Sequence, residues 1–285
     1  MGTLYEALLE QLSIVDKAIE LPAIQAFTFP PLPVDPNARQ NNFAYLSLTD
    51  GSVGLTYVAL DNALQELHSQ HALLPKAGQS AMELAGLYRH SQGWKRALGL
   101  AAINAISQHL LSYSASVNAM PDNLQLLSPQ TDERIGMVGY FARLVDPLRA
   151  KGIPVTVIEL EESLLREEPG LEVTLDTSRL AGCSQVIITG TTLLNHSLDN
   201  ILKHCHEADN VYLLGPSASC LPDALFAAGI THVGGFRVAQ PELFKQRWSE
   251  AGRWRDAGER YFLTRDNYPG AASLIKTALG ANELP

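Results

Sequence analysis

The stretch QVIITGTTLLNHS, residues 185–197, joins an apolar run to a cluster of small polar groups. Residues 186–189 have the character of a strand buried on both faces, which predicts a parallel sheet. The groups that follow at once are Gly190, Thr191, Thr192, Asn195 and Ser197. Open α/β sheets bind ligands at the carboxyl ends of their strands. The stretch therefore predicts the fold class and the position of a ligand site, but it does not name the ligand.

The composition of the chain limits its class. It has 285 residues, 46% of them hydrophobic, and a formal net charge of -9. This content suffices for packed cores, while no apolar run is long enough to cross a bilayer. The acidic balance argues against a nucleic-acid-binding surface, which would concentrate lysine and arginine. The N-terminus lacks the basic and apolar regions of a secretory signal, so we expect a cytoplasmic protein. Its widely spaced cysteines, without a CxxC pair, are expected to be reduced thiols: Cys183, Cys205 and Cys220.

The pattern of expected elements changes near residue 120. Residues 1–120 are expected to contain a helix over 4–21, strands over 24–29, 43–48 and 53–60, and helices over 80–88 and 94–111. This order predicts an α+β domain. The last of these helices is rich in small residues, so its backbone is expected to approach its neighbour closely.

Residues 121–285 alternate strands with helical segments. Strands are expected over 134–138, 155–160, 185–189, 211–214 and 231–233, and a terminal helix near 271–279. Such alternation predicts parallel βαβ units with right-handed crossovers. The expected fold class is therefore α/β, with a doubly wound, Rossmann-like sheet in the second domain.

Two glycines lie near the end of the first of these strands, in RIGMVGYF. Gly139 would let the backbone approach a ligand closely, and Glu159 follows about 20 residues later, the spacing at which dinucleotide folds place an acid against the ribose hydroxyls. The pattern is GxxG rather than GxGxxG, so one close approach is missing. The alternative is that the glycines, Gly136 above all, only fit a helix against the strand.

A second strand end repeats the polar pattern. The stretch VYLLGPSASCLP, residues 211–222, ends its apolar run in Gly215, Pro216, Ser217 and Ser219. Two neighbouring strands that end in glycine and hydroxyl groups favour a cradle for an anion or a carboxylate. Ser197 is expected to cap the helix that follows it, which leaves Thr191, Thr192 and Asn195 free for ligand contact.

Other patterns point less clearly to a site. Adjacent residues on a helix diverge by about 100°, so His204, Cys205 and His206 cannot converge on one ion without partners from elsewhere. The segment RWSEAGRWRDAGERYFL, residues 247–263, interleaves arginines, aromatic rings and acids. It could clamp an anionic ligand or bind a partner chain, and ion-paired helical packing or a dimer contact is favoured over nucleic-acid binding. The motifs GxSxG, GxxxxGK[ST] and HExxH are absent, so no catalytic residue is identified.

Several phrases together resemble a known family. They are LGLAAINAIS, GMVGYFARLVDPLRAKG, VIITGTTLLNHSLDNIL and VYLLGPSASCLPDALFAAGITHVGG. With them the chain resembles, over roughly residues 5–245, the "putative heavy-metal chelation" family of bacteria and archaea. The resemblance implies an enolase-N-terminal-like domain followed by a Rossmann-like domain, and a role in metal chelation or homeostasis. It also implies that Asn104 faces a cleft between the two domains.

The resemblance places the ligand site in this cleft. Together with Glu159 from the strand spacing, the candidate ligand-binding residues are Asn104, Gly139, Tyr140, Phe141, Thr189, Gly190, Thr191, Thr192, Asn195, Gly215, Pro216 and Ser217. Hydroxyl, amide and backbone groups suit a polar or anionic organic molecule, whereas soft heavy metals favour thiolate and imidazole. A metal is therefore expected to arrive within a small organic chelate, or to recruit His196 or Cys220 as minor ligands.

Three functions remain open at this point. The first is a binding protein that captures a metal chelate, or the chelating metabolite, between the domains. The second is an enzyme that makes or modifies such a metabolite. The third is a nucleotide-dependent enzyme, for which Glu159 is the discriminating residue. The expected partner is a small molecule, without nucleic acid or membrane, and a homodimer is expected because symmetric dimers are the commonest assembly.

Overall fold

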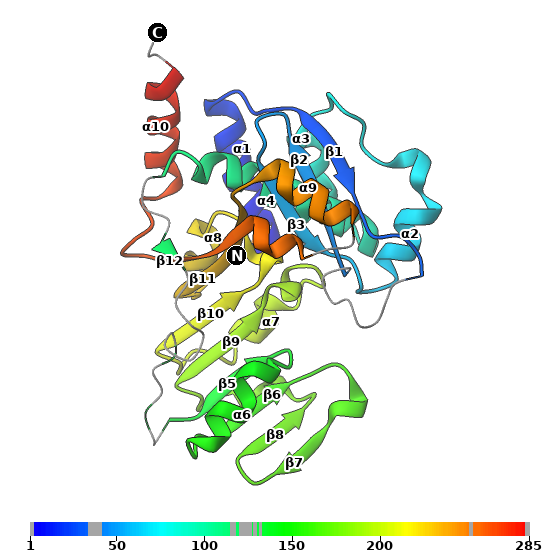
Figure 1. Ribbon diagram of the computed structural model, residues 1–285. Coiled ribbons are helices and arrows are strands. Elements are labelled where there is room, and N and C mark those ends of the chain that lie inside the picture. The colour runs from blue at the N-terminus through cyan, green and yellow to red at the C-terminus, as the bar shows by residue number, and fades with distance from the viewer. Residues whose placement is uncertain are drawn as a thin grey trace.

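The structure is a computed structural model that describes residues 3–33, 42–114, 118–119, 127, 130, 133–250 and 253–282 (Figure 1). Two sheets organise these residues: a three-stranded antiparallel sheet from the first half of the chain, and a nine-stranded, mainly parallel sheet from the second half. Helices pack against both sheets. Among the described residues, no helix is both long enough and apolar enough to cross a membrane.

The first half of the chain forms the small sheet and the helices around it. Its strands are β1 (Ile24–Thr28), β2 (Phe43–Leu48) and β3 (Val53–Tyr57). Its helices are α1 (Leu4–Ala18), α2 (Ala63–Ser69), α3 (Ala81–Ala85), the 3-10 helix η3 (Gly86–Arg89) and α4 (Gly93–Leu111). Each strand and helix expected in this half is present, with some ends shifted by a few residues.

Helix α4 packs directly on strand β3. A Cβ atom on Gly54 of β3 would lie 2.1 Å from the carbonyl oxygen of Ala101 and 2.2 Å from the backbone nitrogen of Ala105. Only a glycine opposite two alanines allows the backbones to approach this closely. The expectation that this small-residue helix approaches its neighbour closely is confirmed.

The second half of the chain supplies the large sheet. Its strand order is β4-β12-β11-β10-β9-β5-β6-β8-β7. The central strands from β11 to β8 are parallel, whereas β4, β12 and β7 run antiparallel to their neighbours. The bounds are β4 (Asn118–Ala119), β5 (Ile135–Val138), β6 (Val155–Ile158), β7 (Arg166–Glu168), β8 (Leu171–Thr174), β9 (Gln185–Thr189), β10 (Asn210–Leu214), β11 (His232–Val238) and β12 (Gly258–Thr264).

The order of the parallel strands reverses between β5 and β9. From β5 the chain builds outward through β6 and β8, and from β9 it builds outward through β10 and β11 on the other side. This is the order of doubly wound sheets, in which ligands bind beyond the carboxyl ends of the two middle strands. The expected α/β class with a parallel sheet is confirmed. The names Rossmann-like and enolase-N-terminal-like for the two parts stay predictions.

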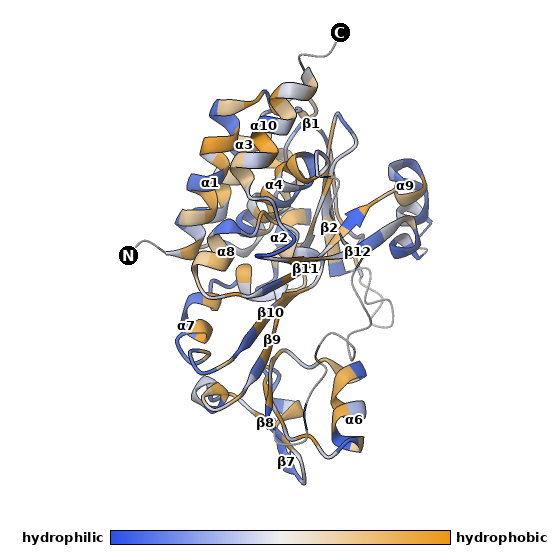
Figure 2. Cartoon of the chain, turned by 90° about the vertical axis from the view of Figure 1, so that its left-hand side faces the viewer, coloured by the Kyte–Doolittle hydropathy of each residue, from blue (hydrophilic) through white to orange (hydrophobic). Residues whose placement is uncertain are grey.

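Helices lie on both faces of the large sheet (Figure 2). Helix α6 (Ala142–Ala150) is on one side, and α7 (Leu198–Leu202) and α8 (Asp223–Ala227) are on the other. After β11 come α9 (Pro241–Ser249), the 3-10 helix η8 (Trp254–Ala257) and α10 (Ala271–Asn282), which confirms the expected terminal helix. Helical packing of the whole arginine-rich segment is wrong, because Tyr261 and Leu263 alternate into the core as part of β12, which pairs with β11.

One hydrophobic core joins the two halves of the chain. It contains Leu8 of α1, Trp94 of α4, Leu213 of β10 and Leu274 of α10, each at most 4% exposed. Helix α1 contacts both α8 and α10, so the first helix packs on elements from the end of the chain. The division into domains at residue 120 stays a prediction.

Candidate functional site

The carboxyl ends of β5, β9 and β10 meet where the strand order reverses. In the sheet register, Val138 lies beside Ile188, and Thr189 beside Leu214. The turns that follow also touch, because a Cβ atom on Gly139 would lie 3.1 Å from Cγ2 of Thr189. Gly139 has a φ of +88°, a conformation that favours glycine. We call residues 139–141, 189–192 and 215–217 the strand-end cluster.

The hydroxyl groups after β9 support their own turn, the 3-10 helix η6 (Gly190–Leu193). Two groups of Thr191 donate hydrogen bonds to the Thr189 hydroxyl. They are the backbone N–H of Thr191, at 3.4 Å, and the side-chain hydroxyl of Thr191, at 3.2 Å. The hydroxyl of Thr192, a residue 3% exposed, donates to the Thr189 carbonyl oxygen at 2.8 Å. Thr189 and Thr191 stay partly exposed. They are the hydroxyl residues of this turn that a ligand can reach.

Ser197 does not have the capping role expected of it, and Asn195 is not wholly free for a ligand. Ser197 occupies the N-cap position of α7, but its hydroxyl makes no capping hydrogen bond. Instead, Asn195 Oδ1 accepts a hydrogen bond from the backbone N–H of Ser197 at 3.1 Å. An N-cap side chain usually needs extended backbone angles, and Ser197 has φ −81° and ψ −15°. The prediction that Ser197 caps the helix through its side chain is therefore wrong, and Asn195 is partly engaged in the local turn.

Asn104 and Ser217 meet, as expected, but within packed protein. Asn104 of α4 is fully buried, and its Nδ2 donates to the carbonyl oxygens of Leu55 at 2.7 Å and Ser217 at 3.0 Å. The Ser217 hydroxyl accepts a hydrogen bond from the backbone N–H of Tyr57 at 3.0 Å. These bonds join α4 and β3 to the turn after β10. Both residues therefore lie in the contact between the two halves and not on the wall of an open cleft.

Glu159 follows β6 and turns toward the end of β5. Its Oε2 accepts a hydrogen bond from the backbone N–H of Tyr140 at 2.9 Å, and its Oε1 accepts from the N–H groups of Leu160 at 2.8 Å and Glu161 at 3.3 Å. Dinucleotide folds present the N–H groups of this turn to a pyrophosphate. Here a carboxylate of the protein occupies the Tyr140 N–H. The arrangement weighs against a nucleotide at this turn, because its phosphates would meet the charge of Glu159.

The rest of the strand-end cluster differs in accessibility. Gly190 is buried, since a Cβ atom there would lie 2.8 Å from the backbone nitrogen of Ala218. The Tyr140 hydroxyl accepts a hydrogen bond from Arg166 Nη2 at 2.7 Å, and the guanidinium lies 5.1 Å from the centroid of the Tyr140 ring. The members that keep partial exposure beside the threonines are Gly139, Tyr140, Phe141, Gly215 and Pro216.

The three thiols are poorly placed to bind a soft metal. Burial raises the pKa of Cys183 to about 11 and the pKa values of Cys205 and Cys220 to about 12. Metals bind the thiolate, which these groups do not form near neutral pH. Within the part of the chain that the structure describes, no group of three or more His, Cys, Asp and Glu residues could hold an ion. Cys220, 0% exposed, does not fit the role of a metal ligand.

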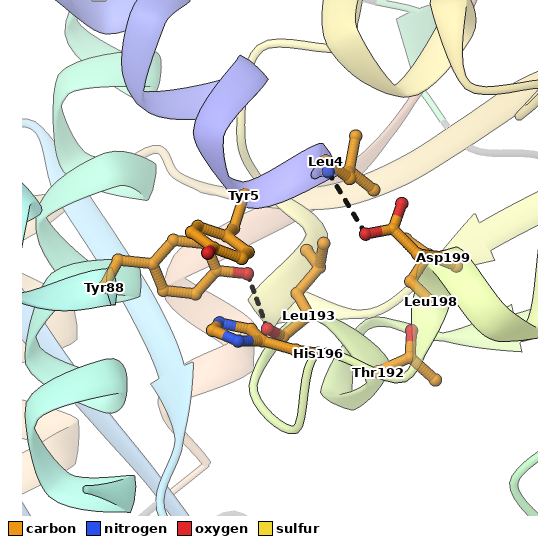
Figure 3. A pocket seen from close by; sticks show the side chains of 8 residues that line it. All are labelled: Leu4, Tyr5, Tyr88, Thr192, Leu193, His196, Leu198 and Asp199. Carbon is orange, nitrogen blue, oxygen red and sulfur yellow. Dashed lines mark hydrogen bonds between the residues drawn. The ribbon is translucent and has the colours of Figure 1, made fainter. Parts of the chain in front are cut away.

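His196 lies in a small pocket bordered by α1, η3, the turn before α7 and Thr192 of the strand-end cluster (Figure 3). Its ring stacks on Tyr5 with centroids 4.8 Å apart and meets the ring of Tyr88 edge-on at 5.1 Å. Burial lowers the pKa of His196, and the charge of Arg96 lowers it further, against the opposing effect of Asp199. Its Nε2 is buried without a hydrogen-bond partner. The lowered pKa favours the neutral imidazole, and among the described residues His196 belongs to no group of three or more residues that could hold a metal ion.

Sequence reasoning missed two residues beside these sites. The Tyr88 hydroxyl donates to the carbonyl oxygen of Leu193 at 2.5 Å and so ties η3 to η6. Nothing in the local pattern around Tyr88 signals this long-range bond. The guanidinium of Arg255 lies 6.0 Å from the ring centroid of Phe43 in the small sheet. The arginine-rich segment indicates an anion or partner site, but its pattern does not distinguish one arginine from another.

The chain is similar to a family of proteins and to an individual relative. Two family models, both described as "Putative heavy-metal chelation", match residues 30–107 and 122–263. An uncharacterized protein of Methanocaldococcus jannaschii is 30% identical over 174 residues, which is 59% of this chain and 66% of that relative. The matched region thus spans slightly less than two thirds of the relative's length.

Two crystal structures have a similar fold. One, from Pyrococcus horikoshii, has a TM-score of 0.69 at 20% identity and covers 90% of this chain and 99% of that chain. The other, from Desulfitobacterium hafniense, has a TM-score of 0.65 at 18% identity and covers 91% of this chain and 99% of that chain. Both are described as proteins of unknown function from the family whose model matches residues 122–263. At these identities the likeness supports the fold alone.

Proposed function

Because the chain belongs to the family described as "Putative heavy-metal chelation", we propose that it binds a metal in the form of a small organic chelate at the strand-end cluster. The observation that carries this proposal is the meeting of the β5, β9 and β10 ends at the reversal of the strand order. Doubly wound sheets bind their ligands at this position.

The chemistry of the cluster supports an organic ligand. Its partly exposed residues include Thr189, Thr191 and Tyr140, which carry hydroxyl groups, together with Phe141 and Gly215. Hydroxyl and backbone groups suit the oxygen atoms of a polar molecule, whereas a bare soft metal prefers thiolate and imidazole. The thiols are buried and protonated, as their raised pKa values indicate. A metal held by its own organic ligand needs no thiolate from the protein.

The nucleotide alternative has less support, because Glu159 occupies the Tyr140 N–H that a pyrophosphate would use. An enzyme that modifies the chelating metabolite would use the same groups. Turnover of the bound molecule, followed by mass spectrometry, separates that function from stoichiometric capture.

We further propose that the protein acts in the cytoplasm as a homodimer, which fractionation and light scattering test directly.

The binding proposal is tested by calorimetry with ferric citrate and nickel citrate, each compared with the metal ion alone. We expect a chelate to bind more tightly than its bare ion. Thr191→Val should weaken chelate binding by about tenfold, because it removes a hydroxyl at the strand-end cluster. Thr277→Val is the matched control, since its hydroxyl lies on an exposed face of α10 and bonds only Ser273.

Two outcomes contradict the proposal. One is that neither chelate binds and elemental analysis of the purified protein finds no metal. The other is that Thr191→Val and Thr277→Val bind every chelate as the unmodified protein does.

A further inference from the structure

Three leucines are exposed at one end of the large sheet. Leu160 follows β6, Leu175 follows β8, and Leu165 immediately precedes β7. Leu160 is 69% exposed, Leu175 47% and Leu165 37%. Among the residues that the structure describes, only four other large hydrophobic side chains are exposed, and those are spread over the rest of the chain. Exposed apolar surface is therefore concentrated at this end of the sheet, the lower end of the molecule in Figure 1.

The ladder between β6 and β8 brings two of these leucines together. Ile158, the last residue of β6, pairs with Thr174, the last residue of β8. The ladder continues for one further bond, because the backbone N–H of Glu159 donates to the carbonyl oxygen of Thr174 at 3.0 Å. Leu160 follows Glu159 directly, and Leu175 follows Thr174 directly. The two leucines therefore leave neighbouring strands side by side.

Leu165 joins them from the third strand. Strand β7 runs antiparallel to β8, and Arg166 pairs with Val173. Leu165 is one residue earlier in the chain, so this register places it level with Thr174, the residue before Leu175. Adjacent strands lie about 4.8 Å apart, so the three leucines are within reach of one partner surface. We call Leu160, Leu165 and Leu175 the leucine patch.

Exposed carboxylates border the leucine patch. Those within two residues of one of its leucines are Glu161, Glu162, Glu167 and Asp176, which we call the acidic rim. Arg149 and Arg166 pair instead with Glu168, and Arg179 pairs with Glu172. In the described parts of the chain, no residue of the acidic rim has an ion-pair partner within 4.0 Å. The patch is therefore an apolar centre with a negatively charged border.

The charge of this border selects the kind of partner. Apolar surface with a polar rim is typical of sites that bind other proteins. A second copy of this chain, docked patch to patch, would bring the carboxylates of two acidic rims together, and like charges repel. Anionic lipids would meet the same repulsion. A partner with lysine or arginine around an apolar centre complements both parts of the surface.

We propose that the leucine patch is a docking surface for a basic, amphipathic segment of another protein. Such segments bind as helices that lay an apolar face on a hydrophobic surface. Their lysines or arginines would here meet the acidic rim. Glu159, next to Leu160, also accepts a hydrogen bond from the backbone N–H of Tyr140 at 2.9 Å, so the docked segment would lie beside the strand-end cluster. The inference stands on this surface alone and does not require the proposed function.

Fluorescence anisotropy with a labelled synthetic peptide tests the apolar part of the surface. The peptide is a short helix of leucine and lysine, with the leucines on one face. Leu160→Ser and Leu175→Ser should each weaken its binding by about fivefold or more, since each removes an apolar contact at the centre of the surface. Leu73→Ser is the matched control, because Leu73 is 66% exposed and lies in the first half of the chain. It should bind the peptide as the unmodified protein does.

Charge reversal tests the acidic rim with the same peptide. Glu162→Lys should weaken binding by about threefold or more and should reduce its dependence on salt, because a rim charge then repels the peptide. Glu10→Lys, at an exposed position of α1, is the matched control and should leave binding unchanged. Both substitutions are at exposed positions and should not impair folding.

Several results would overturn the inference. They are no binding of the peptide by the unmodified protein, and losses in the two control variants as large as those in the variants of the patch and the rim. Equally tight binding of a helix of leucine and glutamate would overturn the assignment to a basic partner. A dimer that Leu160→Ser separates, as measured by light scattering, would assign the patch to a second copy of this chain. Binding to vesicles of anionic lipid that Leu160→Ser abolishes would assign it to a membrane surface.

Discussion

Asn104 donates both hydrogens of its amide to carbonyl oxygens, one from each half of the chain. Asn104→Ala would leave the carbonyls of Leu55 and Ser217 buried without this donor. We expect the free energy of unfolding to fall by about 2 to 4 kcal/mol, as measured by urea unfolding. Asn200→Ala, at an exposed position of α7, should change it by less than about 0.5 kcal/mol. Equal effects of the two substitutions would contradict the structural role of Asn104.

His196 makes the stability of the protein depend on pH. Because burial and Arg96 lower its pKa, the folded protein binds a proton there less readily than the unfolded chain does. Its contribution to stability is therefore present above the ordinary histidine pKa of about 6.5 and is lost as the pH falls through the lower folded value. His196→Asn removes this titration, and asparagine tolerates the φ of +54° at this position.

The test is urea unfolding of both proteins across this pH range. His196→Asn should be less stable at pH 8 by about 1 kcal/mol, because it loses the stack on Tyr5, and this deficit should shrink toward pH 5. His232, whose pKa burial also lowers, should account for part of the remaining pH dependence. Parallel stability profiles for the two proteins would rule out the assigned role of His196.

Residue types at the strand ends predict where polar groups gather, but they do not predict which of these groups stay available to a ligand. Thr189 and Thr191 do lie at the junction of β5 and β9, as their position after an apolar run predicts. The absence of a side-chain cap from Ser197 depends on its backbone angles, which no sequence pattern determines. The burial of Asn104 depends on packing between distant segments. Such contacts are set by tertiary structure and leave no local signal.

At the scale of elements, the contact between α4 and β3 depends on the absence of a side chain at Gly54. A Cβ atom there would lie within about 2 Å of α4 backbone atoms, which cannot move without displacing the helix. Gly54→Ala should therefore lower the free energy of unfolding by about 2 to 3 kcal/mol or more. Gly280→Ala is the matched control, because among the described residues no atom outside its own helix lies within 4 Å of the Cβ position there. A neutral Gly54→Ala would contradict this packing.

Buried parallel strands were the most predictable elements, and the strands near the edges of the large sheet were the least. The apolar run of residues predicts strand β9, because a strand covered on both faces needs continuous hydrophobic residues. Strand β7 consists of Arg166, Glu167 and Glu168, charged residues whose pattern does not predict a strand. It is a strand because β8 offers a neighbour with free backbone groups. Pairing of this kind depends on the partner rather than on the residues themselves.

At the scale of the whole molecule, the reactivity of the cysteine thiols shows whether the shared core is folded. Cys183, Cys205 and Cys220 all belong to the core that joins α1 and α10 to the large sheet. Their burial raises each thiol pKa far above neutral, so the reactive thiolate is scarce as long as the core is closed. If the metal is held by an organic ligand, these thiols have no part in binding it.

Ellman's reagent at pH 8 should therefore leave the three thiols of the folded protein unmodified, and should react with all of them after unfolding in guanidinium. Because the thiols lie in one core, their slow reaction in water should proceed with a single rate that follows global opening. Chelate binding should be unchanged in Cys220→Ala. A different result would assign the metal to a thiolate site in the core. In that case one thiol of the folded protein would react at once, and Cys220→Ala would lose both this reactive thiol and the binding of metal.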